Sequence, residues 1–365
     1  PYIRISDNCG PINLSTSSYV LDFGTSAGTD CTTPGFGGPG NTHASRTGFF
    51  ELNRISEMAR SHLPGNSWLN QQLTANMNIV NTCNAFWDGS TVNFFQSGGG
   101  CANTGEIAGV FDHEWGHGMD DNDANPTVSS PGEGIADIYA YLRLGNSCIG
   151  QGFAPGDKTC LGAYGDPCID CTGIRDIDYQ NRTSQQPHDV AWIDANCPAT
   201  FPTAGPCGGA VHCEGAVYSE AVYDLVNREL TAPPYNMDSN TALEVVTRLT
   251  FAGATNVGNW FQCTTPWGGC NADGGYLNFL AADDDNGTLN DGTPHMTAIV
   301  SAFTDHGIAC NNLTVQDSGC PNIPTTAPAL SSSGSDKSAN LSWNAVSGAT
   351  SYQIFRTDTD GEALA

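Results

Sequence analysis

The feature of this sequence that most constrains its fold is the pattern H-E-x-x-H, formed by His113, Glu114 and His117. In an α-helix, residues four apart lie on one face, so both imidazoles can reach the same metal ion. Glu114 projects beside them, where its carboxylate can take a proton from water. Apolar residues recur at helical spacing before the motif, and Thr104 is placed to cap the helix start. The stretch 107–123 is therefore predicted to be a helix that carries a metal site.

The segment that begins at Ser130 is predicted to form a second helix, with Pro131 at its first position and Gly145 at its end. Glu133 has two interpretations, because it fits a capping box with Ser130 and also fits a metal ligand. Asp137 follows one turn later on the same face, where a carboxylate can orient a ligand histidine. We favour Glu133 as the third metal ligand, with the cap as the alternative.

Several motifs together resemble the thermolysin-like and fungalysin-like zinc endopeptidases, whose third ligand is a glutamate on the following helix. The sequence NAFW at 84–87 is similar to that family's edge strand, which pairs with extended substrate. The sequence GIR at 173–175 resembles the segment whose arginine holds a substrate carbonyl, and the alternative for Arg175 is an ion pair with Asp176 or Asp178. The sequence GGAVH at 208–212 resembles the loop whose histidine stabilises the transition state. The likeness covers residues 50–310, roughly.

The resemblance implies an α+β, two-lobed thermolysin-like fold. A β-rich N-terminal lobe and a mainly helical C-terminal lobe would flank the helix that carries the motif. The site residues that it implies are His113, His117 and Glu133 for Zn²⁺, Glu114 and His212 for catalysis, Asp137 for orienting His113, and Asn84, Ala85 and Arg175 for substrate.

Two departures from the family pattern stand out. The family's tyrosine before the glutamate ligand has no counterpart, since residues 124–132 contain no tyrosine. The aspartate that orients the transition-state histidine is also missing, and Cys207 stands near its place. We therefore expect stabilisation of the oxyanion to differ in detail from the family.

The charge of the chain excludes some classes of partner. The net charge is −26, with 12 Lys and Arg residues against 38 Asp and Glu, and such a surface repels nucleic acid and anionic membranes. No apolar run approaches the roughly 18 residues that a membrane span needs. The composition is typical of a secreted protein in salt- or calcium-rich surroundings.

The 15 cysteines indicate an oxidising compartment. Close spacings favour the bridges Cys263–Cys270 and Cys310–Cys320, and Cys9–Cys31 and Cys83–Cys101 are further candidate bridges. We interpret Cys168 and Cys171 as disulfide-bonded rather than as a redox pair or half of a zinc site, because no second C-x-x-C accompanies them. The odd count leaves one cysteine unpaired or linked to a removed segment. The chain begins at Pro1 without a methionine, and we expect a mature form that has lost its targeting and pro-segments.

Two acidic turns are candidates for binding calcium, which favours oxygen ligands. They are residues 120–123 (DDND) and 283–287 (DDDNG). The alternative for each is an ordinary solvated turn.

We predict two parts along the chain. Residues 1–320 form a metallopeptidase domain, divided into a β-rich lobe with the zinc helix (1–123) and a helical lobe (124–320). Residues 321–365 form a linker and a truncated segment that resembles a fibronectin type III domain, with strands at 340–345 and 351–356 and with Trp343 and Tyr352 as apolar anchors.

The predicted function is that of a secreted, monomeric zinc endopeptidase that acts on peptides and proteins. One alternative is an exopeptidase with the same metal chemistry, which would need a group that binds a free chain terminus. The other is a non-catalytic extracellular adhesin or binding module in which zinc is structural. A fourth protein ligand such as His188 or His295 would favour the binding module.

Overall fold

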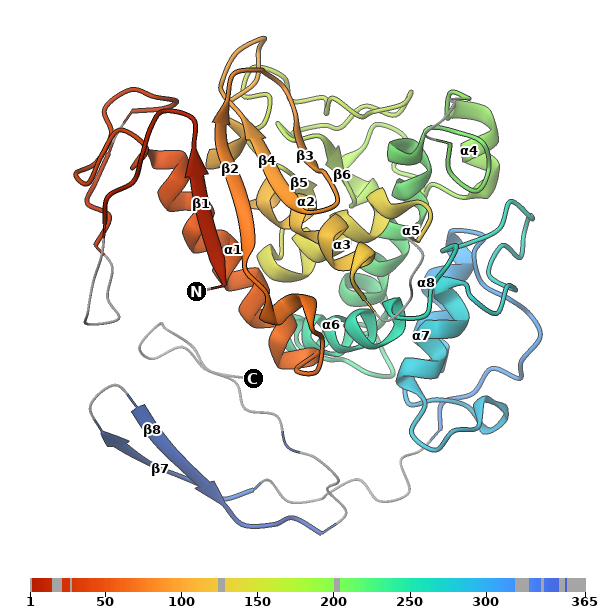
Figure 1. The fold of residues 1–365 in the computed structure, drawn as a ribbon. Coiled ribbons are helices and arrows are strands. Elements are labelled where there is room, and N and C mark those ends of the chain that lie inside the picture. Colours follow the sequence, from red (N-terminus) through yellow and green to blue (C-terminus); the bar gives the residue numbers. More distant parts are fainter. Residues whose placement is uncertain are drawn as a thin grey trace.

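The computed structural model of the protein describes residues 2–14, 22–26, 28–123, 129–199, 204–318, 328–335, 338–347 and 352. The first part of the chain forms one sheet with a long helix beside it, and the later part is mainly helical (Figure 1). The strands are β1 (Ile3–Asp7), β2 (Leu73–Ile79), β3 (Ala85–Trp87), β4 (Thr91–Phe95), β5 (Cys148–Ile149), β6 (Arg175–Asp176), β7 (Leu330–Ser335) and β8 (Ser338–Trp343). The α-helices are α1 (His43–His62), α2 (Ala108–Asp121), α3 (Gly132–Leu144), α4 (Val190–Asn196), α5 (Val211–Asp224), α6 (Ser239–Ala254), α7 (Gly275–Asp283) and α8 (Met296–Asp305). Short 3₁₀ turns lie at Trp68–Asn70, Thr104–Glu106, Tyr179–Asn181 and Leu289–Asp291, and a π-helical turn at Leu225–Glu229 extends α5.

The main sheet has four strands in the order β1-β2-β4-β3. β2 pairs in parallel with β1 and β4, whereas β3 pairs antiparallel with β4. The dipeptide Asp88-Gly89 within the alternating stretch 78–96 predicts the turn of a β-hairpin. This turn is confirmed between β3 and β4, where the Asp88 carboxylate accepts hydrogen bonds from the backbone N–H groups of Ser90 and Thr91. β3 is therefore an edge strand, with one side of its backbone free of sheet pairing.

Helix α1 packs on the sheet and against α2. The apolar periodicity of the sequence predicts a helix over 50–63, whereas α1 begins at His43. The Thr42 side chain caps it by accepting a hydrogen bond from the Ser45 N–H. Its buried face is apolar at Leu52 and Ile55. The apolar periodicity therefore predicted this part of the helix and missed only its first turns, before residue 50.

Two predicted helix caps are wrong. α2 begins at Ala108 without a side-chain cap, and Thr104 instead donates its hydroxyl to the Asn84 carbonyl just before β3. α3 begins at Gly132, with Pro131 as an N-cap that has no side-chain hydrogen bond. Ser130 therefore lies outside the capping position, and the capping box is excluded. The end of α3 is as predicted, with Gly145 in the left-handed region at φ 64°.

The described cysteines form seven disulfides, and these correct part of the predicted pairing. Cys9–Cys31 and Cys83–Cys101 are confirmed. Cys263–Cys270 and Cys310–Cys320 are wrong, because Cys270 pairs with Cys310 and Cys263 pairs with Cys207. The remaining bridges are Cys148–Cys171, Cys160–Cys168 and Cys197–Cys213. The two pairs predicted from short spacing are wrong because the fold brings together cysteines that are 56 and 40 positions apart. Cys320 lies outside the described residues.

The C-terminal hairpin differs from the predicted strand pattern. β7 pairs antiparallel with β8, with Leu330 opposite Trp343. Residues 330–335, predicted as linker, are thus a strand, because they pair with the strand that carries Trp343. Tyr352 lies with its ring 5.6 Å from that of Trp343, and the rest of 351–356 lies outside the described residues. The likeness to fibronectin type III, the domain boundaries and the two-lobe division stay predictions.

Candidate metal centre and cleft

A cleft of about 640 Å³ lies where β3, α2, α3, β6 and the start of α5 meet. Its lining includes every residue that the sequence assigned to the metal, to catalysis or to substrate. Asp137, which the sequence assigned to orienting His113, is not part of the lining. Asn84 and Ala85 border it from the edge strand, Asn84 exposed and Ala85 buried. The structure therefore brings together residues that are up to 128 positions apart, from Asn84 to His212 (212 − 84).

The two histidines of the motif and Glu133 converge on one point. The Nε2 atoms of His113 and His117 are 3.2 Å apart. The Glu133 carboxylate lies 3.2 Å from Nε2 of His113 and 3.6 Å from Nε2 of His117. One ligand atom from each residue lies within 4.8 Å of the others, so this trio could bind a metal ion. Two imidazoles and one carboxylate form a donor set that suits Zn²⁺.

Close backbone packing between helices brings the trio together. A Cβ on Gly116, between the two motif histidines, would lie 2.8 Å from the Cα of Ala136 on α3. Only glycine therefore lets α2 and α3 approach this closely. The approach places Glu133, near the start of α3, beside His117.

Asp137 joins the metal-binding trio to Arg175. Its Oδ1 lies 2.8 Å from His113 Nδ1, which leaves Nε2 of that ring directed at the other two residues. Arg175 is 2% exposed, and it donates to Asp137 from Nε at 2.6 Å and from Nη2 at 2.8 Å. Its Nη2 also reaches the Glu133 carboxylate at 3.4 Å. The predicted alternative partners of Arg175, Asp176 and Asp178, are therefore wrong, and its contact with a substrate carbonyl stays a prediction.

Glu114 is only 6% exposed, yet it lines the cleft. Its carboxylate accepts a hydrogen bond from the backbone N–H of Trp87 on the edge strand. Burial raises the pKa of this carboxyl to about 7, because an apolar surrounding disfavours the charged form. The group is thus next to both the metal-binding trio and the strand expected to hold substrate.

His212 begins the first turn of α5, and its side chain is 53% exposed. Its Nε2 lies 3.1 Å from the Glu133 carboxylate, so it faces the same point as the trio. Glu214, two residues later, accepts hydrogen bonds from the backbone N–H groups of Cys207 and Gly209. This carboxylate fixes the loop before α5, and the sequence argument missed it.

The two motif histidines differ in how strongly their surroundings favour positive charge. Burial lowers the pKa of His113, but hydrogen bonds to Asp137 and Glu133 outweigh it and raise the pKa to about 10. Burial lowers the pKa of His117 to about 4, so that ring stays neutral and keeps a lone pair for a ligand bond. The Glu133 carboxylate, which lies 3.2 Å from Nε2 of His113, would stabilise a metal cation at that side of the ring.

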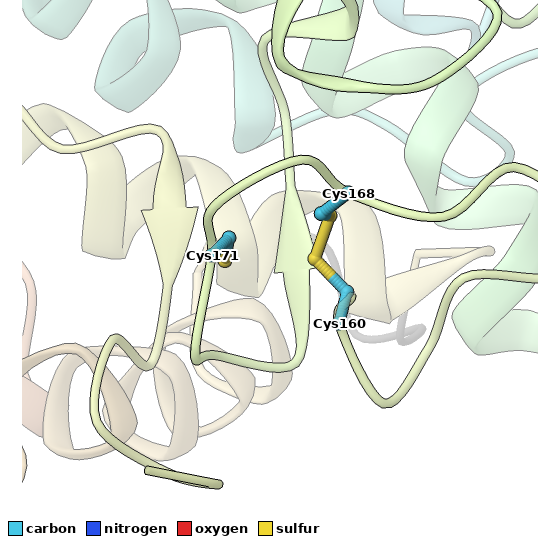
Figure 2. Close-up of side chains that lie close together, drawn as sticks. All are labelled: Cys160, Cys168 and Cys171. Carbon is cyan, nitrogen blue, oxygen red and sulfur yellow. A yellow bond between two sulfur atoms is a disulfide. The ribbon is translucent and has the colours of Figure 1, made fainter. Parts of the chain in front are cut away.

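The cysteine cluster and the two acidic turns are the other candidate metal sites, and their side chains already have partners within the protein. Cys160, Cys168 and Cys171 lie close together (Figure 2), but all three are in disulfides, so they offer no thiolate. In the acidic turns, Asp121 accepts a hydrogen bond from the indole of Trp87 and Asp283 accepts one from His295. These carboxylates thus already have protein partners, and calcium at either turn stays a prediction.

The candidate fourth ligands lie elsewhere. His188 is buried with Nε2 3.1 Å from Asp166 and Nδ1 2.8 Å from Glu220. His295 lies 2.7 Å from Asp283. Neither belongs to the trio's cluster among the described residues, so neither supports a closed structural zinc site.

Comparisons with known proteins bear on the fold of the chain. No protein-family model matches the chain, and no curated protein matches it. The structure has a fold that a metalloproteinase precursor also adopts, which supports the predicted mixed α+β class. The particular structure is the precursor of protealysin, a metalloproteinase from Serratia proteamaculans. It is 15% identical, with a TM-score of 0.51 over 84% of this chain and 87% of that one.

Proposed function

We propose that the chain is a secreted zinc-dependent endopeptidase that cuts internal peptide bonds of extracellular proteins. The observation that carries this proposal is the convergence of His113, His117 and Glu133 on one point of a cleft, with Glu114 beside them. The fold shared with a metalloproteinase precursor supports it. So does the edge strand along the cleft, because a free strand edge can bind an extended peptide.

The three converging residues would hold the metal, and Asp137 would fix the orientation of the His113 ring. When bound, Zn²⁺ supplies Lewis-acid chemistry, polarising the scissile carbonyl and making water more acidic. Arg175 would hold Asp137 and Glu133 in place through its buried hydrogen bonds. Both partners of each bond are charged, and such hydrogen bonds are stronger than those between neutral groups.

Glu114 would take the proton from the attacking water and pass it to the leaving amine, since its carboxylate lines the cleft next to the trio. His212 would donate a hydrogen bond to the developing oxyanion from its exposed imidazole. Asn84 and Ala85 would pair with the backbone of the substrate. This pairing would place an internal peptide bond, rather than a chain end, at the centre of the cleft.

Secretion as a monomer with peptide and protein substrates is part of the same proposal. The seven disulfides among the described residues support an oxidising compartment. None of the helices in the described part of the chain is both long and apolar enough to cross a bilayer. The strongly negative charge disfavours nucleic acid as a partner.

Cleavage of a denatured protein with and without a chelator tests the proposal. We expect fragments cut at internal bonds, loss of cutting when the metal is removed, and recovery on adding Zn²⁺ but not Ca²⁺ alone. Release of single residues from one end would instead identify an exopeptidase. One zinc per chain with no cutting would identify a binding module, and either outcome would reject the proposal.

A further inference from the structure

Tyr164 lies in the loop 160–168, to which the sequence argument assigned no site residue. The Cys160–Cys168 disulfide closes this loop at its base (Figure 2). The backbone N–H of Gly162 donates to the Ile174 carbonyl at 2.8 Å, and that of Asp166 donates to the Ala163 carbonyl at 3.0 Å. The loop is therefore pinned beside the start of β6, which carries Arg175.

The packing at Gly162 places the tyrosine ring next to Arg175. A Cβ on this glycine would lie 3.3 Å from Cγ of Arg175 and 3.6 Å from Cε2 of Tyr164. The glycine thus fits between these two side chains. Because Arg175 contacts Asp137 and Glu133, the tyrosine lies one side chain away from the proposed metal ligands.

Tyr164 has a backbone conformation that tyrosine rarely adopts, with φ 44°. In this left-handed region a bulky residue is strained by about 1–3 kcal/mol relative to glycine or asparagine. Strain of this kind persists where the surrounding structure imposes it, and it concentrates at functional sites. The half-buried Tyr164 side chain lines the same cleft as the edge strand and the proposed metal ligands.

The hydroxyl of Tyr164 is available to a ligand. Within the described part of the chain it has no hydrogen-bond partner, and burial raises its pKa, so the phenol stays protonated and keeps its donor. Arg175, which the sequence assigned to a substrate carbonyl, uses Nε and Nη2 on carboxylates. The cleft thus has a neutral donor beside the predicted cationic donor, which already uses two of its three nitrogens on carboxylates.

We infer that Tyr164 is a substrate-contacting residue whose phenol donates a hydrogen bond to a backbone carbonyl of an extended peptide in the cleft. This inference rests on the proposed function. It adds a second polar contact to the substrate backbone, besides the β3 edge at Asn84 and Ala85. A contact with a carbonyl away from the reacting bond acts equally in the bound substrate and in the transition state.

The test measures peptide binding as well as cleavage. The protein is zinc-loaded and carries Glu114→Gln, and the probe is fluorescein-labelled oxidised insulin B chain, an extended peptide. Adding Tyr164→Phe, which removes only the hydroxyl, should weaken binding about three- to tenfold. Tyr235→Phe is the matched control, because its hydroxyl donates to Asp317 and neither residue lines the cleft, and it should bind like the parent. In the otherwise native protein, Tyr164→Phe should raise KM by the same factor and leave kcat within about twofold.

The outcomes separate this inference from the proposed function. Unchanged binding and unchanged KM in Tyr164→Phe, in a protein that cuts the peptide, would overturn the role of Tyr164 and leave the peptidase proposal standing. Weakened binding in a protein that never cuts would keep the contact and reject the peptidase. Failure of the zinc-loaded Glu114→Gln protein to bind the peptide would overturn the inference as well. Equal losses in Tyr164→Phe and Tyr235→Phe would also overturn it, because they would indicate a general structural effect.

Discussion

Gly134 of α3 and Gly215 of α5 meet backbone to backbone. A Cβ on Gly134 would lie 2.9 Å from the Gly215 carbonyl oxygen, and a Cβ on Gly215 would lie 2.8 Å from the Gly134 nitrogen. These glycines are next to Glu133 and one turn after His212. Their contact therefore sets the 3.1 Å separation between the Glu133 carboxylate and the His212 ring.

Gly215→Ala tests whether this contact positions the site. A methyl group 2.8 Å from backbone nitrogen must push α5 away from α3, and overpacking of this kind costs about 1–3 kcal/mol. We expect a lower melting temperature and a loss of kcat/KM of at least about tenfold, because a displacement of His212 weakens its contact with the oxyanion. Gly156→Ala is the control, since nothing lies within 4 Å of the added methyl group. Equal activity of the two variants would argue against a role of this contact in the site.

Glu114→Gln tests the proton-transfer role. The amide keeps the shape of the side chain but cannot accept the proton, so we expect activity to fall by about 10²–10⁴-fold. Zinc content and thermal unfolding should stay close to those of the native protein. The exposed Glu57 on α1 provides the control, and Glu57→Gln should leave peptide hydrolysis unchanged. Full hydrolysis by Glu114→Gln would contradict the role.

Asp137→Asn tests the link between His113 and Arg175. It removes a carboxylate that orients the ligand ring, and we expect zinc affinity to fall by about 10–100-fold in competition with a chelator. It also leaves the Arg175 guanidinium with fewer negative partners in a buried place, which should destabilise the metal-free protein by about 3–5 kcal/mol in urea.

The double variant Asp137→Asn/Arg175→Met separates these two effects. Removal of the unpaired charge should restore part of the free energy of unfolding, whereas zinc affinity should stay low. Recovery of both quantities together would show that Asp137 acts only through overall stability.

His306 gives a prediction for the pH dependence of stability. It is buried, with Nε2 3.2 Å from Asp224 and Nδ1 3.9 Å from Glu220. Burial lowers its pKa, but the hydrogen bond to Asp224 and the charge of Glu220 outweigh this and raise the pKa above the ordinary value of 6.5. The protonated ring therefore adds stability that is complete below pH 6.5 and is lost as pH rises through the folded-state pKa.

Urea unfolding of the native protein and His306→Gln across this range checks the sign. The difference in their free energies of unfolding should be largest on the acidic side of the histidine's ordinary pKa and should shrink as the pH is raised. A difference that grows with pH would contradict the assignment.

Local patterns were enough to predict much of the candidate site. His113 and His117 are four residues apart, so they lie on one helix face wherever that helix packs, and the same holds for Glu133 and Asp137. The turn at Asp88 and Gly89 was equally predictable, because few residues adopt the positive φ that tight hairpin turns require. These predictions depend on contacts within a few residues of chain.

Contacts between distant segments were not predictable in this way. Arg175 pairs with Asp137, 38 residues earlier, although Asp176 is its neighbour in sequence. Cys270 pairs with Cys310 across 40 residues rather than with Cys263. The strained Tyr164 carries no local signal, since its conformation is imposed by the loop around it. Such features follow from how helices and loops pack, which local sequence patterns do not specify.

Anomalous diffraction at the zinc absorption edge, from crystals grown with Zn²⁺, tests the central claim most directly. The account predicts a single strong peak about 2.0–2.2 Å from His113 Nε2, His117 Nε2 and a Glu133 oxygen, with no fourth protein ligand. A map without a peak at this point would contradict the account. A peak whose fourth ligand is His212 or another side chain of the protein would contradict it equally, because a closed site cannot activate water.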